Sequence, residues 1–338
     1  MTERIISYQS AIAEAIAQEM RRNPDVIILG EDIAGGAGRE DQGIKDVWGG
    51  AFGTTKGLVS EFGSNRVLDT PITESGFMGA AIGSAATGLR PIVELMFVDF
   101  AGVAFDQIVN QAAKLRYMFG GKARIPMTVC CSIGGGVNAA AQHSQVLYSL
   151  FAHIPGLKSV APSSPYDMKG LLAGAIRDDD PVMVFQHKGL LGAKENVPEE
   201  SYTIPLGQAD VKRLGDDVTL VAISRMVHVS LEAAKQLEGE GISAEVVDLR
   251  SLSPLDEQAV LDSVTKTGRL VVVDEDTPRC SMATDIAALA ADKGFDHLDA
   301  PIKRITAPHT PVPFSPPLEK FYLPDTQKVT TAVKELMG

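Results

Sequence analysis

Short apolar runs alternate along the chain with amphipathic or alanine-rich stretches. Apolar runs of about four to eight residues bounded by Gly, Pro or Asp are typical of buried strands. Stretches in which apolar residues recur every three or four positions indicate helices that cover a sheet. Strands and helices that alternate in this order predict an α/β protein with mostly parallel sheets.

The first half of the chain carries one set of such elements. Its predicted strands lie near Val26–Leu29, Ile92–Val98, Met127–Cys131, Lys158–Val160 and Val182–Phe185. Its predicted helices lie near Ser10–Arg21, Gly76–Thr87, Phe105–Met118, Ser144–Phe151 and Pro165–Arg177. Together they predict a doubly wound domain over residues 1–188.

The second half repeats the pattern after a break. Residues 189–205 lose periodicity and gain acids, Gly and Pro, so we expect a linker there and a second doubly wound domain over 206–338. Its strands are predicted at Val218–Ile223, Ala244–Asp248, Leu270–Asp274 and Ile302–Ile305, and its helices at Val227–Glu240, Glu257–Thr267 and Met282–Lys293. A proline-rich stretch, 306–325, is expected to be an extended arm that packs on this domain or on another subunit. Two domains also suit a length of 338 residues.

Composition narrows the class of protein. The formal net charge of −12 argues against a nucleic-acid partner, because phosphate neutralisation needs clustered Lys and Arg. No apolar run approaches the ~20 residues of a membrane span, and the early acids do not suit a signal peptide. Cys130 and Cys131 are adjacent in a predicted strand, Cys280 stands alone, and no zinc-type spacing exists. We therefore expect a cytoplasmic protein without a membrane partner.

Glu74 is the most informative single residue. It lies in Thr-Glu-Ser-Gly at the entrance to a helix of small residues, where an ionised carboxylate should be hard to support. A raised pKa would let the carboxyl donate a hydrogen bond. The alternative is that Glu74 only stabilises the dipole of the helix.

Two further residues admit two interpretations each. His143 follows a glycine-rich turn and precedes a predicted helix, so it lies either at the edge of a pocket or in ordinary packing. Phe100 ends an apolar strand at the edge where α/β proteins bind ligands, so its ring either stacks on a flat heterocycle or closes the core.

Glycine-rich segments at 35–38, 49–57 and 134–136 raise the question of a phosphate-binding loop. Neither GxGxxG between a strand and a helix nor GxxxxGK[ST] is met, which disfavours nucleotide binding by this chain alone. The absence of a GxSxG elbow likewise disfavours a serine hydrolase. The three aspartates 178–180 form either a solvated turn or part of a cation-binding loop.

Several blocks of sequence together carry a resemblance. They are LGED at 29–32, RVLDTPITESGFMGAAIGSAATGLRPIVE at 66–94, AAKLRYMFGG at 112–121, AAQHSQ at 140–145, PGLKSVAPSSPYDMKGLL at 155–172, AIRDDDPV at 175–182 and VVDLRSLSPLD at 246–256. In order and spacing they resemble the β subunit of the thiamine-diphosphate-dependent dehydrogenase component of 2-oxo acid and acetoin dehydrogenase complexes. The resemblance implies a transketolase-like pyrimidine-binding domain followed by a transketolase C-terminal-like domain.

The resemblance also implies roles for single residues. Glu74 matches the glutamate that hydrogen-bonds the aminopyrimidine of thiamine diphosphate and favours its imino tautomer. Phe100 matches the aromatic residue packed against that ring, and His143 matches a histidine at the substrate and lipoyl end of the site. The Met127 carbonyl, Ala175, Asp178 and Asp180 match a loop that holds a structural potassium ion in several members. Relatives often read Asp-Asn-Asn or Asp-Asn-Pro where this chain has three aspartates.

The motif that holds the diphosphate and Mg²⁺ in thiamine enzymes, GDG followed by NN, is absent from the chain. The resemblance implies that an α subunit supplies it in an α2β2 heterotetramer, which passes its product to a lipoyl-bearing acyltransferase core. The segment 35–53 that precedes Thr55, with Trp48 and the run at 95–108, is most similar to acetoin dehydrogenase. Pyruvate or a branched-chain 2-oxo acid is the alternative substrate. A non-catalytic bracing and docking subunit and an NAD-binding oxidoreductase are the competing classes.

Overall fold

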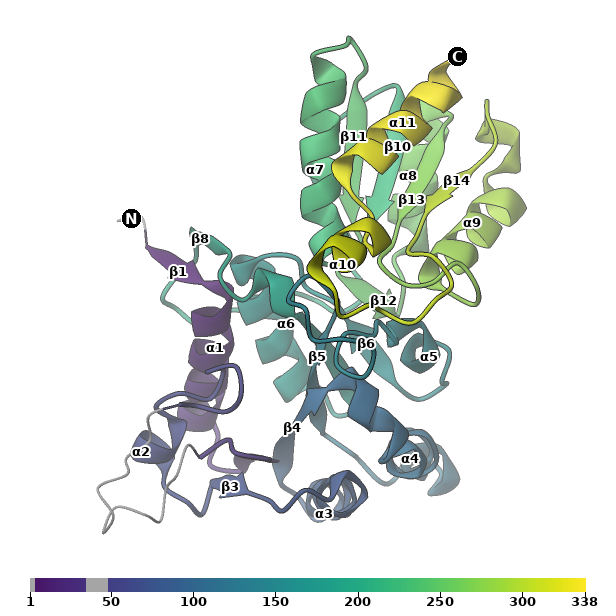
Figure 1. Ribbon diagram of the computed structural model, residues 1–338. Helices are drawn as coiled ribbons and strands as arrows, with labels where there is room; N and C mark the ends of the chain where they lie inside the picture. The colour runs from purple at the N-terminus through teal and green to yellow at the C-terminus, as the bar shows by residue number, and fades with distance from the viewer. Residues whose placement is uncertain (1–3, 35–47) are drawn as a thin grey trace. The chain divides into compact units, whose positions relative to one another are not determined.

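The computed structural model describes residues 4–34 and 48–338, which form two compact units (Figure 1). The first unit comprises the described residues of Met1–Ser132, with Phe151–Gln186 and Leu190–Leu206. The second comprises Ile133–Leu150, His187–Gly189 and Gly207–Gly338. Residues 133–150 and 187–189, from the middle of the chain, thus belong to the same unit as the second half. The predicted boundary instead lies at residue 188, and it stays a prediction. The glycines at 35–38 and residues 35–47 of the inserted segment lie outside the described residues.

The first unit is built on a sheet whose strands run in the order β6-β7-β5-β4-β2-β3. Strand β2 pairs with β3 and with β4, β4 pairs with β5, and β6 pairs with β7, and all four pairs are parallel. Parallel strands bring their carboxyl ends to one edge, where α/β proteins bind ligands. The strands are β2 (Val26–Gly30), β3 (Val67–Asp69), β4 (Arg90–Phe97), β5 (Thr128–Ile133), β6 (Lys158–Val160) and β7 (Val182–His187).

Helices of this half of the chain begin where the sequence supplies caps. The Ser7 and Ser164 side chains accept hydrogen bonds from the first turns of α1 and α6, which stabilises each helix start. The helical elements are α1 (Tyr8–Arg22), α2 (Leu58–Phe62), α3 (Glu74–Ala86), the 3₁₀ helix η2 (Val98–Gly102), the π-helix η3 (Gln107–Ala112), α4 (Ala113–Met118), α5 (Tyr148–Ala152), α6 (Pro165–Arg177) and the 3₁₀ helix η4 (Lys188–Leu190).

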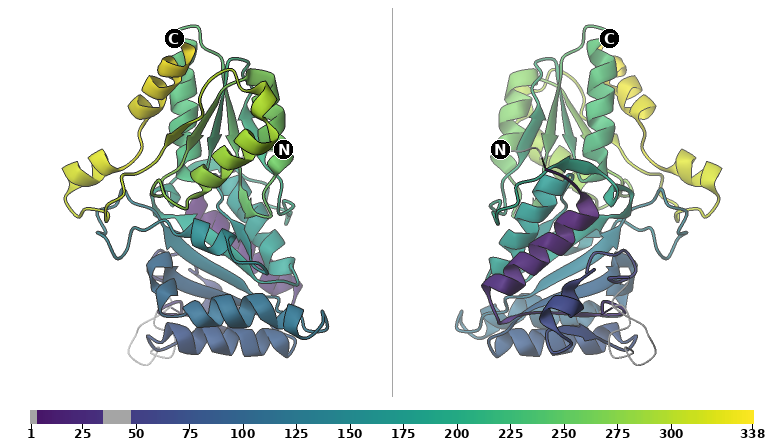
Figure 2. Two further views of the ribbon diagram at one scale, coloured as in Figure 1. Left: turned by 90° about the vertical axis from the view of Figure 1, so that its right-hand side faces the viewer. Right: turned by 90° about the vertical axis from the view of Figure 1, so that its left-hand side faces the viewer.

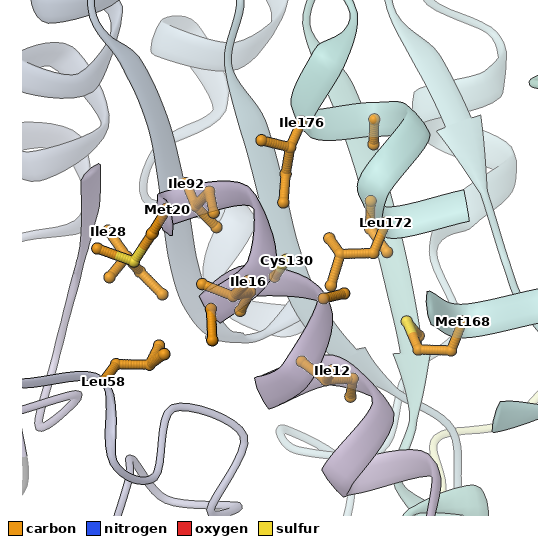
Figure 3. Close-up of a cluster of buried hydrophobic side chains, with 14 of the residues drawn as sticks. Ile12, Ile16, Met20, Ile28, Leu58, Ile92, Cys130, Met168, Leu172 and Ile176 are labelled. Atoms are coloured by element: carbon orange, nitrogen blue, oxygen red, sulfur yellow. The ribbon is translucent and has the colours of Figure 1, made fainter. Parts of the chain in front are cut away.

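The core of the first unit lies between α1, α6 and the sheet (Figure 3). Apolar residues three or four positions apart give α1 a buried face, whereas α6 is buried on nearly all sides. Apolar side chains of both helices pack on buried side chains of β2, β4 and β5. Burial of this surface stabilises the unit by about 25 cal/mol per Å² of apolar area. The labelled members are Ile12, Ile16, Met20, Ile28, Leu58, Ile92, Cys130, Met168, Leu172 and Ile176.

The second unit is a sheet in the order β14-β13-β10-β11-β9, with helices on both faces (Figure 2). Strands β14, β13, β10 and β11 are parallel, and β9 joins the edge antiparallel. The elements are β9 (Asp210–Arg213), β10 (Val218–Ala222), α7 (Arg225–Glu238), β11 (Ala244–Asp248), α8 (Glu257–Thr267), β13 (Leu270–Val273), α9 (Met282–Lys293), η5 (Phe295–His297), β14 (Lys303–Ile305) and α11 (Thr326–Met337). The predicted fold, two α/β domains with mostly parallel sheets, is confirmed.

Three short strands complete the fold. β1 (Ile5–Ser7) and β8 (Lys194–Asn196) form an antiparallel pair, and β12 (Ser251–Ser253) follows β11. Within residues 4–34 and 48–338, no helix is long and apolar enough to cross a membrane.

The proline-rich arm differs from the extended segment that the sequence predicts. Its middle forms the helix α10 (Pro316–Tyr322), which begins with two prolines in its first turn, where a missing N–H costs nothing. Ala307, Val312, Tyr322 and Leu323 form a small apolar cluster within the second unit. The Ala307 amide donates to the Asp276 carbonyl at 3.1 Å, and Glu319 of α10 accepts from the Gly136 amide at 2.9 Å. The arm therefore packs on the chain's own second unit, which is one of the two predicted alternatives.

Two other predicted helices also differ. The single helix expected at 105–118 is a π-helix followed by α4, and the helix expected at 144–151 begins only at Tyr148. The π segment lies against α3, where a Cβ added at Gly79 would come within 3.3 Å of the Gln107 side chain. π segments occur often at functional sites.

Candidate active site

Glu74 is the first residue of α3 and only 8% exposed, although its neighbours Thr73 and Ser75 are exposed. The segment that leads into it follows β3 at the carboxyl edge of the parallel sheet. No side chain caps the start of α3, so the free amides of the first turn favour an anion or a hydrogen-bond acceptor there. The carboxyl is thus both withdrawn from water and at a helix N-terminus, as the two interpretations of the sequence require.

Glu31 is a second acid at this edge, and the sequence reasoning did not single it out. It follows β2 directly, and among the described residues its Oε1 atom is buried without a hydrogen-bond partner. Burial raises the pKa of Glu31, and the negative charges of Glu74 and Asp32 raise it further. Glu31 and Glu74 are therefore close enough to repel each other when both are ionised. The available signal was an acid placed immediately after a fully apolar strand.

Phe100 lies in η2, directly after β4, at the same edge of the sheet. Its ring contacts Phe97 edge-to-face with centroids 5.4 Å apart, and Phe97 contacts Phe52 in the same way at 5.3 Å. A bulge in β4 between Glu94 and Phe97 turns this row of rings. Phe100 is half-buried.

A hydrogen bond connects the segments that carry Glu74 and Phe100. The Ser75 hydroxyl donates to the carbonyl of Val103, which directly follows η2. The structure therefore brings the predicted acid and the predicted aromatic residue onto adjoining segments of the first unit. A flat heterocycle with a polar edge is the kind of ligand that such a pair can hold.

Glu94 is a further acid that the sequence reasoning missed. It lies within β4 beside Cys130 of β5, fully buried, and burial raises its pKa to about 8 despite a hydrogen bond from the Met96 amide. Among the described residues, its Oε2 atom has no hydrogen-bond partner, and neither have the side-chain oxygens of Ser132 and Gln186. A lone acid inside an apolar strand was the sequence signal for this buried polar group.

His143 belongs to the second unit, in the loop between β5 and α5, and is half-buried. Its backbone amide donates to the Ala140 carbonyl at 3.4 Å, and its own carbonyl accepts a hydrogen bond from the Lys188 ammonium group. The structure therefore fixes the backbone on both sides of this histidine within the second unit. It brings Glu74 and Phe100 together in the first unit and leaves His143 in the other.

The predicted cation loop is a network of ion pairs. Asp178 binds the Lys158 ammonium group at 2.7 Å, Asp180 binds Arg116 at 2.5 Å, and Asp179 binds Arg90 at 2.5 Å. Within the described part of the chain, no group of three or more His, Cys, Asp or Glu side chains could hold a metal ion. The carboxylates in this turn are therefore engaged by protein cations.

Backbone oxygens in the same region remain as ligands for a cation. The Met127 carbonyl accepts a hydrogen bond from the Val182 amide at 2.9 Å, and the Ala175 carbonyl accepts one from the Asp178 amide at 3.2 Å. Each carbonyl oxygen has a second lone pair. The two carbonyl oxygens can each accept a further contact, whereas the carboxylates of the aspartate turn are engaged by Lys158, Arg116 and Arg90.

Two family models cover most of the chain. The model of the transketolase pyrimidine-binding domain matches residues 4–194, and the model of the transketolase C-terminal domain matches residues 207–329. The fold is also similar to a solved structure, a split-gene transketolase described as an inactive β4 tetramer, with a TM-score of 0.78, 23% identity and 98% of each chain covered. The fold and the edge that carries Glu74 therefore define a transketolase-type protein.

Curated relatives narrow this class. The chain is 61% identical to the β subunit of acetoin:2,6-dichlorophenolindophenol oxidoreductase of Bacillus subtilis (strain 168), over 99% of this chain and 98% of the relative. It is 58% identical to the subunit of the same name from Cupriavidus necator, with the same coverage. The 2-oxoisovalerate dehydrogenase β subunit of Bacillus subtilis is 44% identical over 98% of each chain. The chain belongs to the family of transketolase-type dehydrogenase β subunits.

Proposed function

We propose that the chain is the β subunit of a thiamine-diphosphate-dependent acetoin dehydrogenase, which cleaves acetoin and passes an acetyl group to a lipoyl domain. The choice of acetoin as substrate rests on a difference in sequence identity between two groups of relatives. Relatives named for acetoin are 58 and 61% identical over nearly the full length, whereas one named for 2-oxoisovalerate is 44% identical. The inserted segment before Thr55 supports the same substrate.

The residues at the carboxyl edge of the first unit fit the aminopyrimidine end of thiamine diphosphate. When bound, this cofactor supplies a carbon nucleophile and an electron sink for carbon–carbon cleavage. Glu74 would hydrogen-bond the aminopyrimidine nitrogen and hold a proton there, since its carboxyl is withdrawn from water at this edge. Phe100, which is partly exposed, would pack against the ring and exclude water from it.

Glu31 supports the work of Glu74. The negative charges of Glu74 and Asp32 add to burial in raising the pKa of Glu31. Glu31 therefore holds its proton more tightly while Glu74 is ionised, which limits the negative charge at this edge of the sheet. His143 lies at the substrate end of the site in this proposal, where an imidazole is able to orient a hydroxyl or ketone oxygen.

Other groups come from partners. We propose that an α subunit holds the diphosphate and Mg²⁺, that the assembly is an α2β2 heterotetramer, and that its acceptor is a lipoyl-bearing acyltransferase core in the cytoplasm. A potassium ion would be held by main-chain oxygens around Met127, Ala175, Asp178 and Asp180, since the aspartate carboxylates are paired with Lys158, Arg116 and Arg90. The absence of a GDG motif in this chain supports the need for the α subunit.

One assay tests the substrate. The chain is co-expressed with its α subunit, and acetoin, pyruvate and a branched-chain 2-oxo acid are compared with 2,6-dichlorophenolindophenol as the electron acceptor. We expect acetoin to have the highest kcat/KM. Dominant turnover of pyruvate would overturn the proposed substrate and leave the family assignment in place.

A second assay tests whether this chain takes part in chemistry or only braces the α subunit. Glu74→Gln and Phe100→Ala are combined in the assembled complex, and binding of thiamine diphosphate is measured by calorimetry. We expect weaker binding than in the unaltered complex. Equal affinity would favour the bracing subunit.

A further inference from the structure

The loop that leads to His143 has an unusual backbone. Every second residue at its start has a positive φ: Gly134 at +87°, Gly136 at +95°, Asn138 at +57° and Ala140 at +62°. Alternation of this kind turns successive N–H groups toward one concave side, which forms an anion-binding nest. Asn138 and Ala140 carry a Cβ, so this conformation is strained and requires support from its surroundings.

Two carboxylates of the second unit fill this nest. The Gly135 amide donates to Glu275 Oε1 at 2.6 Å, the Gly136 amide to Glu319 Oε1 at 2.9 Å, and the Asn138 amide to Glu319 Oε2 at 3.0 Å. Both acids are almost fully buried. Charge-assisted hydrogen bonds of this length in a buried setting are among the stronger polar contacts in proteins. The nest that would suit a phosphate is therefore occupied by the protein itself.

Glu275 is anchored on its far side. Its Oε2 atom lies 2.9 Å from His187 Nε2, and the Arg225 guanidinium donates to the Gly135 carbonyl at 3.3 Å. Burial alone would raise the pKa of Glu275, but the His187 ring, Arg225 and the Gly135 amide together lower it. Glu275 thus stays ionised and holds the beginning of the loop.

Glu319 comes from the arm and holds the end of the nest that is nearer to His143. It lies in α10, whose residue Tyr322 packs in an apolar cluster with Leu323, Ala307 and Val312 of the same arm. A hydrogen bond of 3.1 Å from the Ala307 amide to the Asp276 carbonyl joins the arm to the rest of the second unit. One Glu319 oxygen accepts a hydrogen bond from the Gly136 amide and the other from the Asn138 amide. Both of these residues have a positive φ, and Asn138 is the first residue of the alternating series that carries a Cβ. A short turn separates Asn138 from His143, and the hydrogen bond from the His143 amide to the Ala140 carbonyl closes it.

We propose that Glu319 is a positioning residue for His143, which it holds in place by filling the nest with its carboxylate. The proposal rests on the proposed function, because that function places His143 at the substrate end of the site. It assigns a task in the reaction to the proline-rich arm, whose sequence indicated only packing. Glu319 itself touches neither substrate nor cofactor.

The test uses Glu319→Gln in the assembled complex. Glutamine keeps the shape and one acceptor but turns an NH₂ group toward an amide donor, so one of the two bonds is lost. Glu335→Gln is the matched control, since Glu335 makes an exposed ion pair with Lys303. We expect hydrogen exchange at residues 135–138 to rise at least about tenfold and kcat for acetoin to fall about tenfold, with the affinity for thiamine diphosphate unchanged.

A double-mutant cycle separates positioning from general stabilisation. If Glu319 acts through His143, Glu319→Gln should have no further effect on kcat in the His143→Ala background. Effects that multiply would overturn the proposal, and so would exchange and turnover equal to those of the Glu335→Gln control. If Glu319→Gln fails to assemble, Glu319→Asp, which reaches only one of the two amides, takes its place in the same cycle.

Failure of the proposed function gives a different result. In that case His143→Ala leaves acetoin turnover at the level of the unaltered complex, or acetoin is not turned over at all. The exchange measurement on the loop does not depend on the substrate, so it still reports whether Glu319 holds the nest. Unchanged exchange together with normal His143 dependence would overturn only the role of Glu319.

Discussion

Acids in two candidate functional regions of the molecule differ in whether their buried oxygens have hydrogen-bond partners. At the sheet edge of the first unit, atoms of Glu31 and Glu94 are buried without a hydrogen-bond partner among the described residues. In the nest of the second unit, Glu275 and Glu319 together accept hydrogen bonds from three backbone amides, and Glu275 also contacts His187. Buried carboxyl oxygens are therefore left without a partner in one region and are hydrogen-bonded in the other.

The direction of the pKa shift follows the partners. Burial raises the pKa of Glu31 and of Glu94. The charges of Glu74 and Asp32 add to the effect at Glu31, and at Glu94 the hydrogen bond from the Met96 amide does not offset burial. The pKa of Glu275 is lowered despite full burial, because His187, Arg225 and the Gly135 amide stabilise its charge. Glu275, which holds the loop, is paired within the chain, whereas Glu31 and Glu94 each keep one buried oxygen without a hydrogen-bond partner among the described residues.

The largest expected effect comes from Glu74, the buried acid at the start of α3. Glu74→Gln removes the proton that the carboxyl exchanges, so kcat of the assembled complex should fall about 10²- to 10⁴-fold. Thermal stability should be nearly unchanged. Glu61→Gln, which removes an exposed ion pair with Arg21 in the same unit, is the control with normal turnover. Near-normal activity of Glu74→Gln would show that Glu74 takes no part in the proton transfer proposed for it.

The contrast in pKa predicts opposite dependences of stability on pH. Glu94 has a raised pKa of about 8, so the folded chain binds its proton more tightly than the unfolded chain does. The resulting penalty is absent below about pH 4, grows as pH rises, and is complete above about pH 8. Glu94→Gln removes the titration. The free energy of unfolding of this variant, relative to the unaltered chain, should therefore rise by about 3 kcal/mol between pH 5 and pH 8.5 in urea unfolding.

Glu275→Gln is the matched variant on the other side of the comparison. The lowered pKa of Glu275 gives stability that is present above about pH 4 and is lost as pH falls through its folded value. The variant should be less stable by about 3 kcal/mol at pH 7, because it leaves Arg225 and the loop amides without the charge. Its deficit should shrink in acid. If both variants showed the same dependence on pH, the distinction between paired and unpaired acids would be wrong.

Elements with local stop signals were predictable from the sequence. The ranges of α6, α8 and α9 agree with the structure at both ends. Ser164 caps α6 ahead of Pro165, and Asp256 and Gly268 delimit α8. The π-helix at Gln107–Ala112 was not predictable, since its apolar pattern is the same as that of an α-helix and only packing against α3 distinguishes the two.

The residues of the candidate site also differ in how far the sequence could predict them. Glu74 and Phe100 were found because each lies at the end of an element that the pattern shows, at an edge that parallel topology makes common. Glu319 was not found, since its partner Asn138 is 181 residues away and no local pattern reports such a contact. Glu31 was overlooked although its position after an apolar strand was visible.

The smallest effect is expected where acids are paired but exposed to water. Asp179 contacts Arg90 and Arg124 with about a third of its side chain accessible, so solvent screens both pairs. Asp179→Asn should lower the free energy of unfolding by at most about 1 kcal/mol in low salt, and by less in 0.5 M NaCl, measured in urea. A loss of more than about 2 kcal/mol that persists in salt would mean that this turn holds structure as firmly as the nest does. An ion pair alone would then be enough for an acid to stabilise the fold, whereas the nest indicates that the paired acid must also be buried.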